Sequence, residues 1–410
     1  MEAYTTPSGL KRYRLPAVYT PLNKHRFISS DIPLFAVHMA VFQDMLWQQA
    51  HEERATIKRK KLGFEMNAKR KELSSQQKLK IAEGRTEIAQ QELKAAFQTL
   101  AAGLDNPLDF DWDKLKSYPE YPRPKPAKPA APEPPFKPAL PREPLPTDGA
   151  YQPKLEPLDK LRRAKRDEKA REARERYEAA HEKWKQVCAR VTKVYQSQKL
   201  QYKQAVEQVQ QQHQQQVTAW EAGREKYRQE REQCVQLVDK KKAAYLEHEA
   251  NAVIDFFDMA LAWAAYPSSF PHSYEMDYDA QNRLLTLDYL LPPLRVMPRL
   301  VTVVYNESTH SFHETLLSDE ERNGWYAKLL HELPLRIILE MFSIDNAASL
   351  AAIQFRGYLF LSDNKKQQPK PPACVLNVQA DRGVLASIDV YHADPVVVFE
   401  ELGGMIRPLE

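Results

Sequence analysis

Residues 122–146 read PRPKPAKPAAPEPPFKPALPREPLP, and the wider segment 105–157 holds 15 of the chain's 30 prolines. Proline lacks the backbone donor that a helix needs and favours the extended polyproline II conformation, which rises about 3.1 Å per residue. The segment therefore predicts a semi-extended proline strap rather than a folded domain. The alternative for it is a ligand for SH3-like or WW-like grooves. In either case the strap divides the helical part of the chain in two.

Residues 31–104, on the amino-terminal side of the strap, have helical character. Asp31 is a plausible N-cap, and Pro33 stands just inside the expected helix. Four apolar residues recur at helical spacing and define one face, namely Phe35, Met39, Phe42 and Leu46. An apolar face of this kind needs a partner to cover it.

Residues 158–250, on the other side of the strap, show a coiled-coil pattern. Apolar and aromatic residues recur mostly at a spacing of seven: Tyr177, Trp184, Val191, Val206, His213, Trp220, Tyr227 and Cys234. Arg224, Arg231 and Lys241 also fall on this seam. An isolated helix of such length is not stable without a packing partner. We therefore expect a long, antiparallel, coiled-coil-like helical hairpin between 31–104 and 158–250, with dimerisation as the alternative.

The two ends of the chain differ in character. Residues 1–30 alternate aromatic, basic and proline positions and predict an extended arm that docks on another surface. Residues 251–410 predict a compact α+β domain with a mainly antiparallel sheet. We expect its strands in 272–278, 284–290, 300–305, 352–361, 374–379 and 385–390, and its helices from Ser318 to Phe342 and from Pro395 to Leu402. The overall fold class is thus mostly α with an added α+β domain.

The formal net charge of +4 conceals a strong asymmetry. Residues 1–250 contain 47 Lys and Arg against 34 Asp and Glu, whereas residues 251–410 contain 12 against 21. A basic helical region can contact nucleic acid, an anionic membrane surface, an acidic protein partner or the chain's own acidic domain. The candidate contacts for nucleic acid or an anionic surface are Lys11, Arg12, Arg14, Arg26, Arg162, Arg163 and Arg166. Glutamates interleave with the last three, as they do on an ordinary solvated helix.

The cysteines and the apolar segments bear on the compartment. Three cysteines lie far apart in the sequence, which predicts no disulfide framework and favours a reducing compartment. The start of the chain does not resemble a secretory signal. The most apolar stretch, 32–47, is interrupted by polar residues and is shorter than the roughly 20 residues that span a membrane. We expect a cytoplasmic protein.

Motifs for chemistry are few. The sequence contains no P-loop, no dinucleotide fingerprint and no nucleophile elbow. Asp277, Asp279 and Asp288 are more typical of hairpin turns than of a metal site. His310 and His313 have a ligand-like spacing but lack a third and fourth ligand. We therefore predict no catalytic, cofactor-binding or metal-binding residue, and a protein that is not an enzyme.

Four blocks carry a resemblance to a known family. They are YPSSFPHSYEMDYDAQNRLLTLDYLLP from Tyr266, LHELPLRIILEMFSID from Leu330, IQFRGYLFLSD from Ile353, and CVLNVQADRGVLASIDVYHADPVVVFEEL from Cys374. In order and spacing, residues 240–402 resemble the region that precedes the nuclease domain in bacterial Mrr-type restriction endonuclease proteins. In those proteins the nuclease domain comes next, whereas this chain stops at Glu410, so no catalytic residue of the family can be carried over.

The resemblance implies a role in prokaryotic anti-phage defence. We expect a non-catalytic sensor, adaptor or scaffold that acts through contacts with a separate effector protein. The alternatives are a direct DNA-binding subunit of a restriction-type complex and a purely structural coiled-coil oligomer. A protein partner or self-association is the principal expectation, and nucleic acid or a membrane surface are further candidate partners.

Overall fold

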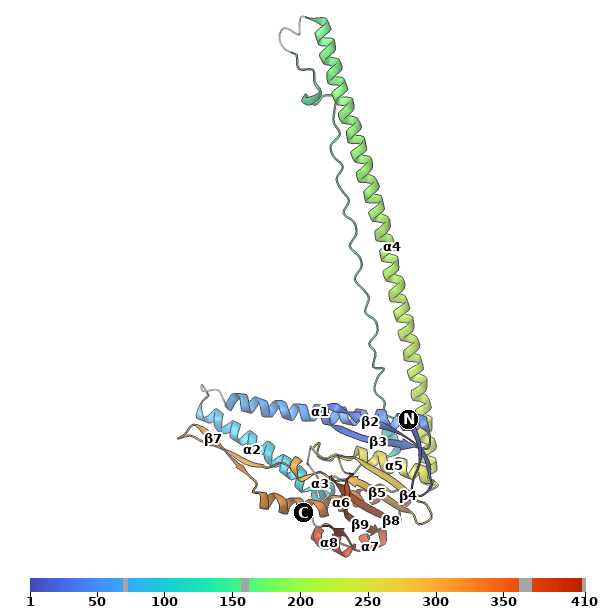
Figure 1. Ribbon diagram of the computed structural model, residues 1–410, viewed down its shortest axis with the longest axis vertical. Helices are drawn as coiled ribbons and strands as arrows, with labels where there is room; N and C mark the ends of the chain where they lie inside the picture. Colours follow the sequence, from blue (N-terminus) through green and yellow to red (C-terminus); the bar gives the residue numbers. More distant parts are fainter. Residues whose placement is uncertain (69–72, 156–161, 361–370, 408–410) are drawn as a thin grey trace. The chain divides into compact units, whose positions relative to one another are not determined.

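The computed structural model describes residues 1–68, 73–155, 162–360 and 371–407. The chain divides into two compact units, and each is described by itself (Figure 1). Unit 1 contains Met1–Glu120 and Gln229–Glu410, and unit 2 contains Tyr121–Arg228. Helix α4, Arg163–Leu246, contributes to both units, and its 84 residues correspond to about 126 Å of helix. Much of the chain is helical, and the sheets are mostly antiparallel.

Unit 1 begins with a three-stranded antiparallel sheet, where the sequence predicted an extended arm. Its strands are β1 (Glu2–Thr5), β2 (Lys11–Tyr19) and β3 (Lys24–Ser30), with the short 3-10 helix η1 (Thr20–Leu22) between β2 and β3. Pro16 does not prevent this pairing. The first residue of β1, Glu2, pairs with Arg14, so at Pro16 β2 has a neighbouring strand, β3, on one side only. Sheets tolerate proline at such edge positions. The expectation of an extended arm was therefore wrong.

Helices α1 (Pro33–Ala68), α2 (Ser75–Phe97) and α3 (Thr99–Asp105) follow. The sequence placed the start of the proline strap at residue 105, but residues 105–120 belong to unit 1. The 3-10 helix η2 (Trp112–Lys116) lies there, and Phe110, Trp112 and Leu115 are buried in the core. Apolar burial explains the difference, since three large side chains hold this short segment against the domain.

The α+β part of unit 1 contains a five-stranded sheet in the order β10-β9-β8-β5-β4. Its strands are β4 (Tyr274–Asp279), β5 (Leu284–Leu290), β8 (Ala352–Leu359), β9 (Ala373–Asp381) and β10 (Met405–Ile406). Only β5 and β8 pair in parallel. The accompanying helices are α5 (Ala250–Trp263), the 3-10 turn η5 (Leu294–Val296), α6 (Asp319–Ile344), α7 (Arg382–Ala386) and α8 (Pro395–Glu401). Ser318 caps α6 with Glu321 in a capping box.

Two strand predictions differ from the structure. The strand expected in 300–305 is β6 (Leu300–Asn306), but it pairs with β7 (Ser311–Leu316) in a separate hairpin rather than joining the main sheet. The hairpin packs on α2, where Thr86 Oγ1 exchanges hydrogen bonds with the backbone of Val303. No strand forms over 385–390, because the chain turns after β9 into α7 and leaves Ile388 and Val390 half-buried at its end.

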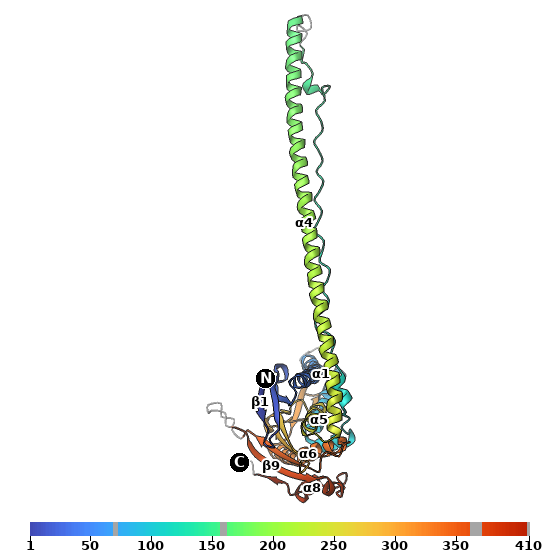
Figure 2. The ribbon, with the colours of Figure 1, turned by 90° about the vertical axis from the view of Figure 1, so that its right-hand side faces the viewer.

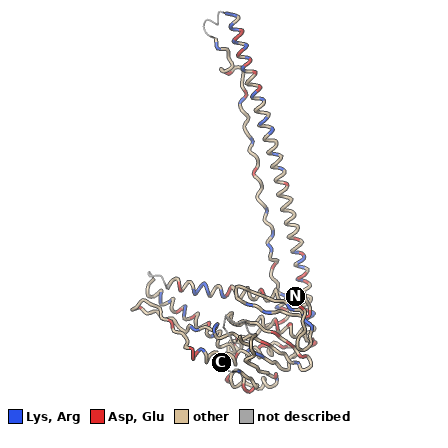
Figure 3. Tube along the Cα trace, in the orientation of Figure 1, with Lys and Arg blue, Asp and Glu red and all other residues tan. Residues whose placement is uncertain are grey.

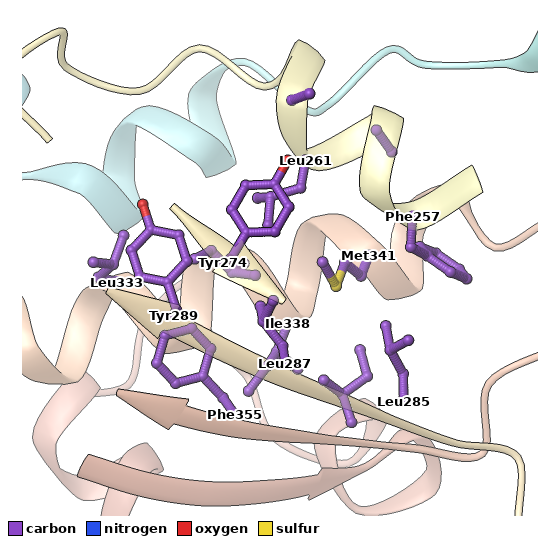
Figure 4. Packing of buried hydrophobic residues seen from close by; sticks show 14 of the residues in the cluster. Phe257, Leu261, Tyr274, Leu285, Leu287, Tyr289, Leu333, Ile338, Met341 and Phe355 are labelled. Atoms are coloured by element: carbon purple, nitrogen blue, oxygen red, sulfur yellow. The ribbon is translucent and has the colours of Figure 1, made fainter. Parts of the chain in front are cut away.

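The core of unit 1 lies between α5, α6 and the five-stranded sheet (Figure 4). Phe257 and Leu261 of α5 meet Leu333, Ile338 and Met341 of α6 in this cluster, together with residues of the strands. Those strand residues are Tyr274, Leu285, Leu287, Tyr289 and Phe355. Nearly every residue of α5 is buried, including two aspartates, which makes this short helix the centre of the domain.

Unit 2 consists of α4 up to Arg228 and the proline strap from Tyr121 onward, which lie side by side (Figures 1 and 2). A one-turn 3-10 helix, η3 (Gly149–Tyr151), interrupts the strap. The expected antiparallel hairpin of two helices is not confirmed, because the strap contacts the seam of α4 in this unit. No helix formed by the described residues is both long and apolar enough to cross a bilayer.

Candidate functional site

The most unusual feature of unit 1 is a buried network of charges around α5. Arg12 of β2 donates to Asp255 at 2.7 Å, and neither side chain is exposed to solvent. Lys241, near the end of α4, donates to the other oxygen of Asp255 at 2.7 Å and also to Asp31. Burial alone would lower the pKa of Lys241, but the two carboxylates raise it overall. Asp255 thus joins the end of α4 to β2, which lies 243 residues away in the sequence.

A second buried pair lies one helical turn further along α5. Arg26 of β3 donates to Asp258 and to the hydroxyl of Tyr274, and its guanidinium lies 4.3 Å from the centre of the Tyr274 ring. Gln43 accepts a further hydrogen bond from Arg26 at 3.0 Å. Breaking a buried pair of this kind leaves an uncompensated charge, which costs about 3–5 kcal/mol. The network therefore holds the amino-terminal sheet on the core.

These contacts correct the prediction for two candidate nucleic-acid residues. Arg12 and Arg26 are buried and paired, so neither is available to a phosphate. Lys11 is exposed. Arg14 pairs with Glu2 at 3.1 Å and lies over the rings of Tyr4 and Phe27. The amino-terminal cations therefore do not form one exposed basic surface.

The sequence could have revealed the partners of Arg12 and Arg26. Asp255 and Asp258 interrupt the otherwise apolar run AVIDFFDMALAW, three residues apart and on one face of a helix. Charges in such a run are almost never buried unless they are paired. The pattern indicates that two cations elsewhere in the chain must meet this face, although it does not identify them.

The aspartates considered as metal ligands in the sequence, Asp277, Asp279 and Asp288, have other partners in the structure. Asp277 accepts hydrogen bonds from the backbone and hydroxyl of Ser8, and Asp279 caps its own turn. Asp288 forms a two-point ion pair with Arg356. Within the described ranges, no group of three or more His, Cys, Asp and Glu side chains is placed to hold a metal ion.

A small cavity of about 210 Å³ in unit 1 contains two groups with lowered pKa values. Burial lowers the pKa of Lys24 to about 8, with help from Arg54. Burial, followed by the charges of Lys24 and Arg26, lowers the pKa of His272 to about 3. Over the part of the chain that the structure describes, His272 Nδ1 has no hydrogen-bond partner. The cavity could hold a small hydrogen-bond donor, and a water molecule would satisfy the same atom.

In unit 2, the heptad seam of α4 is covered by the strap. The indole of Trp184 donates to the carbonyl of Pro141 at 2.8 Å, and the indole of Trp220 donates to the carbonyl of Arg123 at 2.7 Å. Between these contacts the strap advances 18 residues, which is about 56 Å of polyproline II. The helix advances 36 residues, which is about 54 Å. The two lengths match, so strap and helix run side by side without slack.

The strap presents a face made of proline. Seven prolines recur at every third position: Pro126, Pro129, Pro132, Pro135, Pro138, Pro141 and Pro144. A polyproline II helix has three residues per turn, so these seven share one face. Five of them are half-buried, while the residues between them in 127–143 are exposed. The half-buried positions of α4 likewise form one narrow stripe, which includes Tyr177, Trp184 and Trp220.

Aromatic contacts close both ends of this strapped helix, residues 121–155 and 163–228. Tyr121 packs against Trp220 and Tyr227, and Tyr151 packs against Tyr177. Gly223 permits the approach of Tyr121, because a β-carbon there would lie 2.5 Å from the Tyr121 hydroxyl. Arg162, Arg163 and Arg166 lie exposed at the start of α4.

Comparison of the chain with protein-family models, with curated proteins and with solved structures gives no match.

Proposed function

We propose that the protein is a non-catalytic sensor, adaptor or scaffold of a prokaryotic, restriction-like anti-phage system. It acts in the cytoplasm through contacts with a separate effector protein. The observation that carries this role is the strapped helix, in which the apolar stripe of α4 is covered by the strap of the same chain. Such an element needs no second helix and serves as a stiff spacer. Unit 1 is then the part that contacts the effector or its trigger.

The defence context rests on the four blocks that resemble the region before an Mrr-type nuclease domain. These blocks supply β4 and β5, the second half of α6, β8, and the segment from β9 to α8. They therefore belong to one part of unit 1, the five-stranded sheet with α6, α7 and α8. Because the four blocks fold together, this part can act as one recognition surface. That supports a role shared with the Mrr-type proteins more strongly than four blocks in separate places would.

Co-expression tests the adaptor role. The chain is expressed alone and together with the genes that flank it, and cells are challenged with phage. We expect protection only when the chain and one flanking gene product are both present, and a complex of the two that survives purification. Protection by the chain alone, or cleavage of DNA by the purified chain with Mg²⁺, would exclude a non-catalytic adaptor.

A variant of unit 2 separates the spacer from the contact surface. Trp184→Ala with Trp220→Ala removes both indole anchors of the strap and leaves unit 1 unchanged. We expect the complex with the effector to persist while protection falls. The matched control is Gln186→Ala with Gln211→Ala, at two exposed positions of the same helix. Equal protection by the variant and the control would rule out the spacer role.

A further inference from the structure

The middle of α4 carries cations without compensating carboxylates. Between Glu182 and Glu207 there are six basic residues and no acidic one, namely Lys183, Lys185, Arg190, Lys193, Lys199 and Lys203. All six are exposed. Figure 3 colours the basic and acidic positions along the Cα trace. As far as the structure describes the chain, none of the six forms an ion pair. We call residues 183–203 the basic section.

The start of α4 differs from the basic section in this respect. Residues 162–178 contain eight arginines and lysines, but four glutamates and one aspartate alternate with them, and Arg174 pairs with Glu178 at 3.0 Å. Pairs four residues apart neutralise one another on a helix surface. Residues 162–178 thus have a net charge of +3, against +6 in the basic section, so the larger excess lies further along the helix than Arg162, Arg163 and Arg166.

The strap adds to the charge of the basic section. Pro126 contacts His213 and Pro141 contacts Trp184, so strap residues 126–141 run beside helix residues 184–213. This part of the strap contributes Lys128 and Lys137 against Glu133. Over about 44 Å of helix, seven cations thus face two carboxylates, Glu133 and Glu207. A positive field of this density attracts polyanions.

The cations lie on faces of the helix that the strap does not cover. At about 100° per residue, Lys185, Lys199 and Lys203 fall within about 40° of one another on one flank of the seam. Lys183, Arg190 and Lys193 fall within about 80° of one another on the far side. The seam itself is turned to the strap. Each group of three is therefore free to approach a phosphate backbone.

We propose that the basic section binds the phosphate backbone of double-stranded nucleic acid without reading its sequence. A duplex carries one negative charge per about 1.7 Å, the density that best complements such a surface. Single strands are bound by stacking on aromatic rings. Here the rings are engaged by the strap, since Trp184 donates to Pro141, and Tyr195 and Tyr202 are half-buried on the same stripe. Only the charges are available.

Salt dependence of binding tests the proposal directly. The full chain is titrated, by fluorescence anisotropy, into a labelled duplex of about 30 base pairs, which is longer than the basic section. If one group of three cations contacts phosphates, the slope of log K against log salt is about −2.7. Affinity then falls about 40-fold between about 50 and 200 mM salt. A flat salt response would overturn the proposal.

Two matched variants locate the contact. The first carries Lys183→Gln, Lys185→Gln, Lys193→Gln and Lys199→Gln, and the second carries arginine at the same four positions. Glutamine, lysine and arginine have similar helix propensities, so both variants keep the helix, which circular dichroism verifies. We expect the glutamine variant to bind about tenfold more weakly or worse, with a slope shallower by about 2, and the arginine variant to bind like the original chain.

Competition distinguishes nucleic acid from an acidic protein surface. Poly-L-glutamate is added at the same concentration of negative charge as the duplex. Displacement as effective as that by unlabelled duplex would assign the basic section to an acidic protein partner and overturn the proposal. Equal binding by the glutamine variant and the original chain would overturn it as well. The adaptor role does not depend on this contact, so failure here leaves it standing.

Discussion

Replacement of Trp184 by alanine is expected to detach the strap near Pro141 without unfolding unit 1. Trp184 is half-buried, and its indole N–H is one of two indole donors that hold the strap. Alanine removes the apolar contact and the hydrogen bond together. The Pro141 carbonyl then loses its donor, because alanine has no side-chain N–H.

The size of the effect follows from the contact. A tryptophan buries up to 150–250 Å² in a core, so a half-buried one contributes about 100 Å², or about 2.5 kcal/mol at 25 cal/mol/Å². Part of that area is covered by the helix itself and is not lost. The hydrogen bond adds about 1 kcal/mol. We expect the local opening free energy to fall by about 2–3 kcal/mol, which is about 30- to 150-fold in the opening equilibrium.

Amide hydrogen exchange measures this opening. Prolines have no amide, so the helix reports the change, and exchange is followed in peptides that cover residues 177–191 and 213–227. Trp184→Ala is expected to accelerate exchange in the first peptide far more than in the second. Trp220→Ala is expected to show the reverse pattern.

Two controls separate strap detachment from a general loss of helix. Gln186→Ala changes an exposed residue two positions away and is expected to leave exchange within about twofold. Trp184→Phe keeps an aromatic ring and loses the donor, so it is expected to cost about 1 kcal/mol. Exchange unchanged by Trp184→Ala, or accelerated equally in both peptides, would refute docking of the strap through the indoles.

Three further outcomes are expected. Asp255→Asn leaves Arg12 and Lys241 without their buried carboxylate. In denaturant titrations it is expected to lower the unfolding free energy of unit 1 by about 3–5 kcal/mol. The control, Asp109→Asn at an exposed pair, is expected to cost under about 0.5 kcal/mol. The pKa of His272 is lowered from 6.5 to about 3, so between these pH values the unfolded chain binds a proton that the folded chain does not. Stability is therefore lost as the pH falls from about 6.5 to 3. His272→Asn, in which asparagine tolerates the positive φ of 52°, is expected to flatten this loss in thermal melts between those pH values. Alanine at Pro126, Pro132 and Pro138 is expected to accelerate exchange in α4, whereas alanine at Pro124, Pro134 and Pro146, off the docking face, is expected to do so much less.

The sequence predicted the strap and the long helix but not their contact. A seam of residues spaced by seven indicates that a helix has a partner, and the commonest partner is another helix. The decisive signal was in the strap, where Pro126 and the six prolines that follow it at intervals of three form one face. The seam recurs about every 10.5 Å along the helix and the proline face about every 9.3 Å along the strap, so each element presents a continuous face that needs a partner.

The amino-terminal sheet was missed for a different reason. Its strands contain proline and many charges, which are weak local signals for a sheet. What stabilises it is the burial of Arg12 and Arg26 against Asp255 and Asp258, more than 230 residues away in the chain. At such separation the spacing of Asp255 and Asp258 indicates that cations must meet them, but no pattern identifies which cations. The candidate site at Arg12 and Arg26 was accordingly misread as an exposed basic arm.

The chemistry of polyproline II explains which residues stand on the seam of α4. This conformation makes no internal hydrogen bonds, and proline offers carbonyls but no N–H, so a strap laid on a helix brings unsatisfied acceptors with it. At the carbonyls of Arg123, Pro126 and Pro141, leucine or valine on the facing helix would bury the acceptor without a donor, at about 1–3 kcal/mol each. Trp184, Trp220 and His213 supply an apolar ring and an N–H in one side chain, and each contacts a strap carbonyl. A heptad seam rich in tryptophan and histidine therefore favours a proline strand over a second helix as its partner.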